Sequence, residues 1–291
     1  MEQTPLIELK NIHKQFRNTT KKLFDDACIS IHKREIVGVL GNNGCGKTTL
    51  SKIIGGLIKP EKGEIFFNGK RITRIDKNYR ENICILGDAN RSLYWNLSGK
   101  QNLEYFSKIM DVDIDESFLY DFIDKMKMNT YIDNKVANYS KGMKQKLLLL
   151  IALVNTPQLI IMDEPLNGLD LESIYIIEDV IKEISKKNDT AFLITSHDKY
   201  FIDEVCSIKY VINDSGKIEK KNDELFSIRE FEVYIKIREI EEFFDLANRA
   251  ELFDEDRNIY KLKVSLNDHI FYKELSVGIQ SRKINVVSIQ V

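Results

Sequence analysis

The sequence predicts an α/β fold with a mostly parallel sheet, followed by a small α+β domain at the C-terminal end. Short apolar runs typical of buried strands recur through the first 225 residues and alternate with stretches of helical periodicity. A glycine-rich loop directly follows one of these apolar runs. After a polar, turn-rich segment at residues 213–217, the pattern changes to strands in which polar and apolar residues alternate.

Composition limits the class of protein. The chain has 291 residues, 43% of them hydrophobic, which is enough to build one large and one small core. Lys and Arg number 43 against 45 Asp and Glu, and no block of five like charges occurs, so no nucleic-acid partner is expected. The four cysteines are widely separated, which disfavours a zinc site or a disulfide framework.

Neither a secretory signal nor a membrane span is visible in the sequence. The first residues lack a basic region followed by an apolar core. The longest apolar run, residues 147–154, is far shorter than the roughly 20 residues that a membrane helix needs. The sequence therefore predicts a soluble protein, for which any role at a membrane requires a partner.

Predicted strands and a helix flank the glycine-rich loop. Residues 6–9 and 36–40 predict strands, and the second is the continuous apolar run expected of a strand buried on both faces. A helix is expected to begin at Thr48, after the loop. Residues 63–69 then predict a strand that ends in an Asn-Gly turn.

The middle of the chain predicts a helical subdomain, at about residues 90–155, inserted in the α/β domain. It is followed by apolar strands at 159–162 and 191–195, which a helix at about 171–187 separates. Because the order strand, helix, strand requires a crossover, these two strands are expected to be parallel neighbours.

A domain boundary is expected near residue 225, which gives a large α/β domain at 1–225 and a small accessory domain at 226–291. The second domain is expected to have the order β-α-β-α-β. Its strands are predicted at 231–238, 260–266 and 283–291, and its helices at 239–250 and 272–281.

The glycine-rich loop carries the strongest motif. It matches the pattern G-x-x-x-x-G-K-[ST] between a buried strand and a helix start. Backbone N–H groups of such a loop, together with the helix N-terminus, bind phosphates. Lys47 would neutralise the β- and γ-phosphates of a nucleotide, and Thr48 would offer its hydroxyl to Mg²⁺. The residues assigned to nucleotide binding are Gly41, Asn42, Asn43, Gly44, Cys45, Gly46, Lys47, Thr48 and Thr49.

Two carboxylates follow the apolar strand at 159–162. Asp163 would hold Mg²⁺ through water, and Glu164 would orient and deprotonate the water that attacks the nucleotide. An apolar run that ends in Asp-Glu is common on its own. Beside a phosphate-binding loop it is the expected second half of an ATP-hydrolysing site, because the carboxyl ends of parallel strands lie at one edge of the sheet.

Residues 139–146, Tyr-Ser-Lys-Gly-Met-Lys-Gln-Lys, resemble the signature sequence of ATP-binding cassette (ABC) proteins, Leu-Ser-Gly-Gly-Gln. Ser140 and Gly142 are kept, whereas Lys141 replaces the first glycine and Met143 the glutamine, a variant associated with bacterial export-type cassettes. The resemblance implies that Ser140 and Gly142 contact the γ-phosphate of an ATP held by another subunit. A plain helix cap at Ser140 is compatible with that role.

Other segments also resemble motifs of the family. Residues 166–170 resemble the loop that crosses the dimer interface in the family, and Asp170 is assigned to the nucleotide site on this basis. His197, after the next apolar strand, resembles the switch histidine, which implies contact with the γ-phosphate and with Glu164. Phe16 resembles the aromatic residue that stacks on adenine, although Phe24 is close by and either could be a core residue.

One position departs from the family pattern. Where the family has a glutamine after the strand at 83–86, this chain has Asp88, which is assigned to Mg²⁺ or its water. The following stretch, 90–97, corresponds to the region where the family docks its membrane partner. Trp95 could be an anchor for that partner or a residue packed within the helical block.

The resemblance covers about residues 5–225 and implies an ABC ATPase, with a P-loop core, an antiparallel β subdomain and a helical subdomain. It implies ATP and Mg²⁺ as ligands, a homodimer around two ATP molecules, and a separate transmembrane permease. The chain is then expected on the inner face of the cell membrane, and export is expected from the signature variant, the acidic Asp88 and the C-terminal domain. The alternatives are a soluble ABC ATPase acting on ribosomes or DNA, and a module that binds ATP without hydrolysing it.

Overall fold

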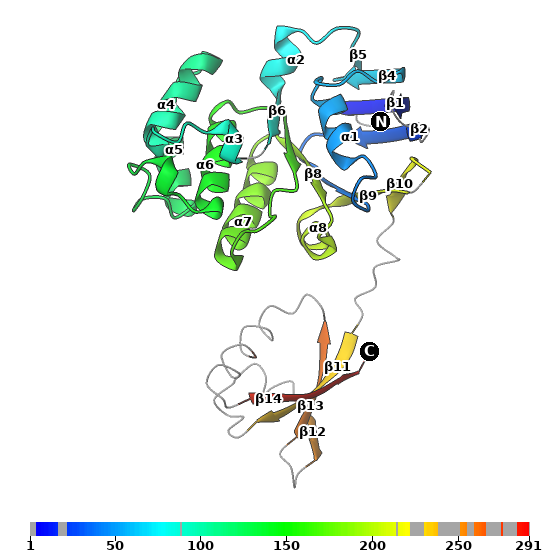
Figure 1. Cartoon of the computed structure of the whole chain (residues 1–291), viewed down its shortest axis with the longest axis vertical. Coiled ribbons are helices and arrows are strands. Elements are labelled where there is room, and N and C mark those ends of the chain that lie inside the picture. The colour runs from blue at the N-terminus through cyan, green and yellow to red at the C-terminus, as the bar shows by residue number, and fades with distance from the viewer. Residues whose placement is uncertain are drawn as a thin grey trace. The chain divides into compact units, whose positions relative to one another are not determined.

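The computed structural model describes residues 4–16, 22–87, 89–213, 215–221, 230–237, 251–254, 259–265, 275 and 284–290. The backbone divides into two compact units, residues 1–221 and 222–291 (Figure 1). Each unit is described by itself. Among the described residues, no helix is long and apolar enough to cross a membrane.

A six-stranded sheet forms the centre of the first unit. Its strands, in spatial order, are β10 (Ile218–Lys221), β9 (Ile208–Ile212), β3 (Ile36–Leu40), β8 (Ala191–Ser196), β7 (Leu159–Asp163) and β6 (Ile83–Leu86). All neighbours are parallel except β10, which runs antiparallel to β9. The parallel pairing of β7 and β8 confirms the prediction from the order strand, helix, strand.

Both faces of this sheet are covered, which explains why the central strands β3, β7 and β8 are apolar along most of their length. Alternate residues of β7 enter different cores, with Leu159 and Ile161 in one and Ile160 and Met162 in the other. The first core includes α1 (Lys47–Ile54), and the second includes α6 (Lys141–Val154), α7 (Leu171–Lys187) and α8 (Lys199–Val205) (Figure 1).

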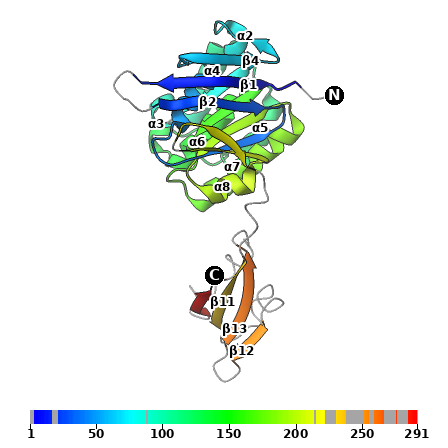
Figure 2. The same ribbon diagram turned by 90° about the vertical axis from the view of Figure 1, so that its right-hand side faces the viewer.

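An antiparallel sheet packs on the α1 side. Its strands, in spatial order, are β2 (Lys22–Ile31), β1 (Ile7–Gln15), β4 (Lys62–Phe67) and β5 (Lys70–Arg71). Figure 2 shows β1, β2 and β4 side by side. Asn68 and Gly69, between β4 and β5, both have positive φ angles, 50° and 74°. They form the Asn-Gly turn that the sequence predicts, because these residue types tolerate the left-handed region.

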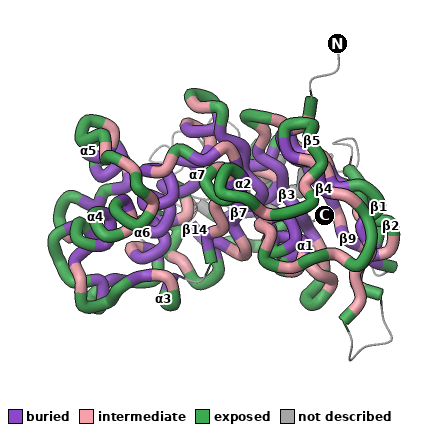
Figure 3. Tube along the Cα trace, turned by 90° about the horizontal axis from the view of Figure 1, so that it is seen from above, coloured by how far each residue is buried: buried purple, intermediate pink, exposed green. Residues whose placement is uncertain are grey.

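The helical subdomain contains α3 (Ala89–Ser92), α4 (Gly99–Met110), α5 (Glu116–Lys125), a 3₁₀ turn (Val136–Asn138) and α6. A helix α2 (Lys77–Asn82) precedes β6. Figure 3 shows α4, α5 and α6 together at one end of the unit, away from β1 and β4. The longest apolar run, residues 147–154, is the buried C-terminal part of α6, so it belongs to the core of the domain.

The second unit contains an antiparallel sheet in the order β12 (Glu251–Asp254), β13 (Ile259–Ser265), β11 (Glu230–Ile237) and β14 (Ile284–Gln290). Three of these strands match the predicted ones, and β12 was not predicted. The predicted helices at 239–250 and 272–281 lie outside the described residues, apart from Leu275, which is helical. Among the described residues, five buried apolar side chains form a small core that joins β11, β13 and β14.

Candidate nucleotide site

The phosphate-binding loop connects β3 to α1, as the sequence predicts. Gly46, the residue before the helix, has φ 115°, and a Cβ atom there would lie 2.9 Å from Cζ of Phe24. Only glycine fits this position, because other residues meet both backbone strain and the buried ring. No side chain caps the N-terminus of α1. Its first N–H groups are therefore available to an anion.

Lys47 is the first residue of α1, and its side chain is buried. Its Nζ donates hydrogen bonds to the carbonyl oxygens of Gly41 at 2.7 Å and Asn42 at 3.4 Å, and lies 3.5 Å from Oε1 of Glu164. The loop therefore holds the ammonium group in a fixed position beside a carboxylate. A phosphate that enters the loop would meet a cation already desolvated and oriented.

The two carboxylates lie where β7 ends beside β8. The hydroxyl of Thr195 donates to Asp163, and the backbone N–H of Glu164 donates to the carbonyl of Thr195 at 2.9 Å. Glu164 has φ 49°, a left-handed conformation that is uncommon for a residue with a side chain. The parallel register thus places both carboxylates at the carboxyl edge of the sheet.

His197 completes the surroundings of Glu164. Its Nδ1 lies 2.8 Å from Oε2 of Glu164, and its backbone N–H donates to the same oxygen at 3.3 Å. The hydroxyl of Ser196 donates to this oxygen at 3.3 Å. The carboxylate of Glu164 is therefore held from one side by β8 and its following loop, and from the other by Lys47.

A cavity of about 470 Å³ lies over the loop. It is lined by Phe16, Leu23, Asn43, Gly44, Gly46, Lys47, Thr48, Thr49 and Glu164. Phe16 is 43% exposed, whereas Phe24 is fully buried in the core. Of the two aromatic residues left open by the sequence, Phe16 is thus the one that a bound nucleotide could contact.

Leu23 was missed by the reasoning from sequence. It is partly buried, lines the cavity, and its Cγ would lie 3.0 Å from a Cβ at Gly46. No motif marks this residue, because Leu23 and its neighbour Phe24 both pack against the same core and both lie close to Gly46.

The oxygen donors near the loop fit Mg²⁺. Hydroxyl and carboxylate oxygens, such as those of Thr48 and Asp163, are the ligands that this hard cation prefers, together with phosphate oxygens and water. No group of three or more His, Cys, Asp or Glu side chains able to hold a metal occurs in the described part of the chain. Asp88, also assigned to the metal, lies outside the described residues.

The segment that resembles the family signature, residues 139–146, lies outside the cavity over the phosphate-binding loop. Ser140 caps α6, where its Oγ accepts a hydrogen bond from the N–H of Met143 at 3.2 Å. Gly142 packs against the start of α7, since a Cβ there would lie 2.3 Å from Oγ of Ser173. Asp170 caps α7, and hydrogen bonds from Ser173 hold the pKa of this carboxyl below its ordinary value. Ser140, Gly142 and Asp170 do not line the cavity over the loop.

The sequence of this chain is similar to those of known proteins. A family model described as ABC transporter matches residues 24–167. The chain is 30% identical over 217 residues to the ABC transporter ATP-binding protein NatA of Bacillus subtilis (strain 168), covering 73% of this chain and 87% of NatA. It is 28% identical to the spermidine/putrescine import ATP-binding protein PotA of Legionella pneumophila (strain Paris), covering 75% of this chain and 59% of PotA.

The fold is shared with solved structures. For cbiO1 from Clostridium perfringens, part of the ABC transporter complex cbiONQ, the TM-score is 0.68 at 23% identity, over 84% of this chain and 96% of cbiO1. The predicted P-loop fold is confirmed by this likeness. Because the similarity to NatA spans most of both proteins, this chain belongs to the ABC transporter family as one of its ATP-binding subunits.

Proposed function

We propose that this chain hydrolyses ATP at sites shared between two copies and so drives a separate transmembrane permease, at the inner face of the membrane. The observation that carries the proposal is the position of Glu164, held by His197 and Ser196 and lying 3.5 Å from the ammonium of Lys47. A carboxylate fixed beside a phosphate-binding lysine is placed to act on a water next to the γ-phosphate.

In the proposed reaction, the loop N–H groups and Lys47 bind the β- and γ-phosphates and neutralise the charge that develops there. Glu164 accepts a proton from the attacking water, and the bond between the γ-phosphorus and the bridging oxygen breaks, which leaves ADP and phosphate. His197 keeps the carboxylate oriented and contacts the γ-phosphate. Mg²⁺, with Thr48, Asp163 and Asp88 as the proposed residues around it, supplies further neutralisation of phosphate charge.

The proposal of shared sites rests on the signature segment. Ser140 and Gly142 begin a 14-residue helix, α6, but do not line the cavity over the loop of their own chain. The partial positive charge at such a helix start favours an anion. In a dimer, this helix start and the loop containing Asp170 would cover the ATP held by the other copy, so each complete site needs two chains.

The proposal predicts a trapped dimer. Glu164→Gln removes the base but keeps the size of the side chain, so the variant should bind ATP, form a dimer with Mg-ATP, and lose at least about a hundredfold in phosphate release. Size-exclusion chromatography and steady-state phosphate release measure these two effects. Glu183→Gln, on the far end of α7 from Asp170, is the matched control and should behave as the parent.

If the Glu164→Gln variant stayed monomeric in saturating Mg-ATP, the shared site would be wrong. If the parent chain released no phosphate above background, the chain would instead be a module that binds ATP without hydrolysing it.

A surface for the permease is proposed on the helical subdomain. Tyr94 and Trp95 are each 46% exposed, and the ring of Tyr94 packs edge-on against that of Tyr105, with centroids 4.5 Å apart. Lys144 lies 4.2 Å over the ring of Trp95, and the indole N–H donates to the carbonyl of Asn90. These rings are therefore held in place while part of each remains open, which suits anchors for a protein partner.

We propose export as the direction of transport. The support is the variant signature Lys141-Gly142-Met143, the acidic Asp88 and the accessory unit after residue 225. NatA carries no direction in its name, and PotA is named for import, so the comparisons leave the direction to experiment. Purifying the chain from membranes with its permease, and measuring ATP-driven movement of solute by that complex, would test both the partner and the direction.

A further inference from the structure

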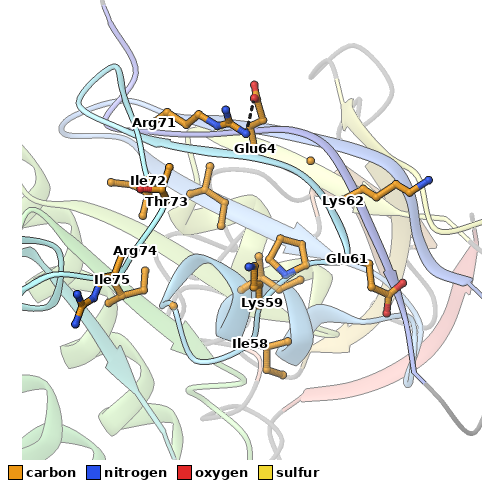
Figure 4. A pocket seen from close by; sticks show the side chains of 15 residues that line it. Ile58, Lys59, Glu61, Lys62, Glu64, Arg71, Ile72, Thr73, Arg74 and Ile75 are labelled. Carbon is orange, nitrogen blue, oxygen red and sulfur yellow. Dashed lines mark ion pairs between the residues drawn. The ribbon is translucent and has the colours of Figure 1, made fainter.

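A second concave surface lies on the antiparallel sheet, outside the nucleotide site. It is a groove of about 460 Å³ between the loop that follows α1 and the segment that follows β5. Figure 4 shows Ile58 to Lys62 along one wall and Arg71 to Ile75 along the other. None of the residues that line this groove also lines the cavity over the phosphate loop.

The floor of the groove is apolar. Ile53 and Ile65 are buried beneath it, and Ile58, Ile72 and Ile75 are only partly covered. The latter three pack on the core with one side and leave the other side open. Branched aliphatic side chains that line a recess in this way can bury an apolar side chain of a partner.

The acidic residues of the groove are already paired. Glu61 lies 3.5 Å from Nζ of Lys14, and its carboxylate accepts the backbone N–H of Gln15. Glu64 lies 3.0 Å from the guanidinium of Arg71. Neither carboxylate is therefore available to neutralise the remaining basic residues of the walls.

Three basic residues of the groove have no acidic partner among the described residues. Lys59, Lys62 and Arg74 are exposed, and none of them forms an ion pair with a carboxylate in the part of the chain that the structure describes. Lys59 and Arg74 belong to opposite walls. A complementary ligand thus needs negative charges that are separated by an apolar group.

The wall after β5 also offers a free row of backbone donors. The N–H of Ile72 still donates to the carbonyl of Ile65, at 2.7 Å. Within the described residues, the next three N–H groups, those of Thr73, Arg74 and Ile75, donate to no protein acceptor. Because β5 is the edge strand of its sheet, an extended peptide can approach these donors from the open side.

We propose that this groove binds an extended acidic peptide segment of a partner protein. The backbone of the segment hydrogen-bonds to residues 73–75, its apolar side chain occupies the isoleucine floor, and its carboxylates face Lys59 and Arg74. A single inorganic anion would leave the floor empty. A lipid surface, being flat, would not reach the recessed isoleucines.

The groove has a physical connection to the nucleotide site. Ile53, in the last turn of α1, lines the groove, and Lys47 begins the same helix at the phosphate loop. A helix of 8 residues is about 12 Å long, at about 1.5 Å per residue. A segment bound in the groove therefore contacts the far end of the helix whose start binds phosphate.

Fluorescence anisotropy tests the proposal on the intact chain. The probe is a short fluorescein-labelled peptide that alternates Asp and Glu with Ile and Leu, and its counterpart carries Asn and Gln instead. The acidic peptide should bind with an affinity that falls as salt rises. The double variant Lys59→Glu with Arg74→Glu should weaken this binding by at least about tenfold, whereas Lys77→Glu, on α2 outside the groove, should leave it unchanged.

Binding of ATP by the double variant is the check on its folding, because neither residue lines the nucleotide cavity. The proposal is overturned if the acidic peptide does not bind the parent chain, or if it binds the double variant equally well. It is also overturned if the parent chain binds vesicles of anionic phospholipid but not the peptide, and the double variant no longer binds the vesicles. The surface would then recognise lipid.

Discussion

At the scale of single residues, two aromatic side chains near the phosphate loop have different roles. Phe16 lines the nucleotide cavity and is 43% exposed, whereas Phe24 is fully buried. Phe16→Ala should weaken ATP binding by about tenfold, because a stacking partner for the base is lost, with little change in stability. Phe24→Ala should lower the free energy of unfolding by about 3 to 5 kcal/mol. Nucleotide titration and chemical denaturation of both variants measure this, and equal effects on stability would contradict it.

The residues around the phosphate loop show how far a site can be predicted from the sequence. The motif of the phosphate loop depends on neighbouring residues, so its place between β3 and α1 could be predicted. The contact between Lys47 and Glu164 joins residues distant in sequence, and only the pairing of the central strands brings them together. Leu23 could not be assigned from any motif, because its place at the cavity follows from how β2 packs beside Gly46.

At the scale of elements, helix α7 contains a buried acid that is not part of the site. Burial is the main cause that raises the pKa of Glu178 to about 7. The charge of Lys182 lowers this pKa, and smaller effects of the charges of Glu204, Asp179 and Asp198 raise it. Since the folded state then holds the proton more tightly than the unfolded state, stability falls as pH rises from about 4.5 to 7.

Glu178→Gln should remove this dependence, because its amide is neutral at every pH. At pH values near 8 the variant should be more stable than the parent, by about 1 to 3 kcal/mol. The difference should shrink as the pH falls below the pKa of the buried acid. Thermal unfolding of both proteins across this range measures the effect, and a constant difference would show that Glu178 is not the titrating group. Glu183 is an acid on the same helix whose pKa is lowered, so Glu183→Gln is the control and should not remove the pH dependence attributed to Glu178.

The elements were predicted most reliably where burial is strong. Residues 36–40, 159–162 and 191–195 are apolar on both faces, so their strands were evident from composition alone. Strand β12, Glu251–Asp254, was missed, because a short edge strand with exposed Leu252 and Phe253 carries no alternating pattern.

At the scale of the whole molecule, we propose that the chain consists of a nucleotide-binding domain, 1–225, and an accessory domain, 226–291. Among the residues that the structure describes, all those that line the nucleotide cavity or form the two large cores lie before residue 222. A fragment that ends at Lys221 should therefore fold and bind ATP with an affinity within about twofold of the full chain. Circular dichroism and nucleotide titration measure this. An insoluble or unfolded fragment would show that the nucleotide-binding domain depends on the accessory one.

The left-handed backbone of Glu164 affects how the trapped variant is to be interpreted. This conformation costs on the order of 1 kcal/mol for a residue with a side chain, and such costs are tolerated where activity requires them. Gln has the same cost, so Glu164→Gln leaves the backbone strain in place. Any gain in stability of that variant would then measure what the protein gives up to keep a charged carboxylate at this position, a trade-off between stability and the proposed turnover.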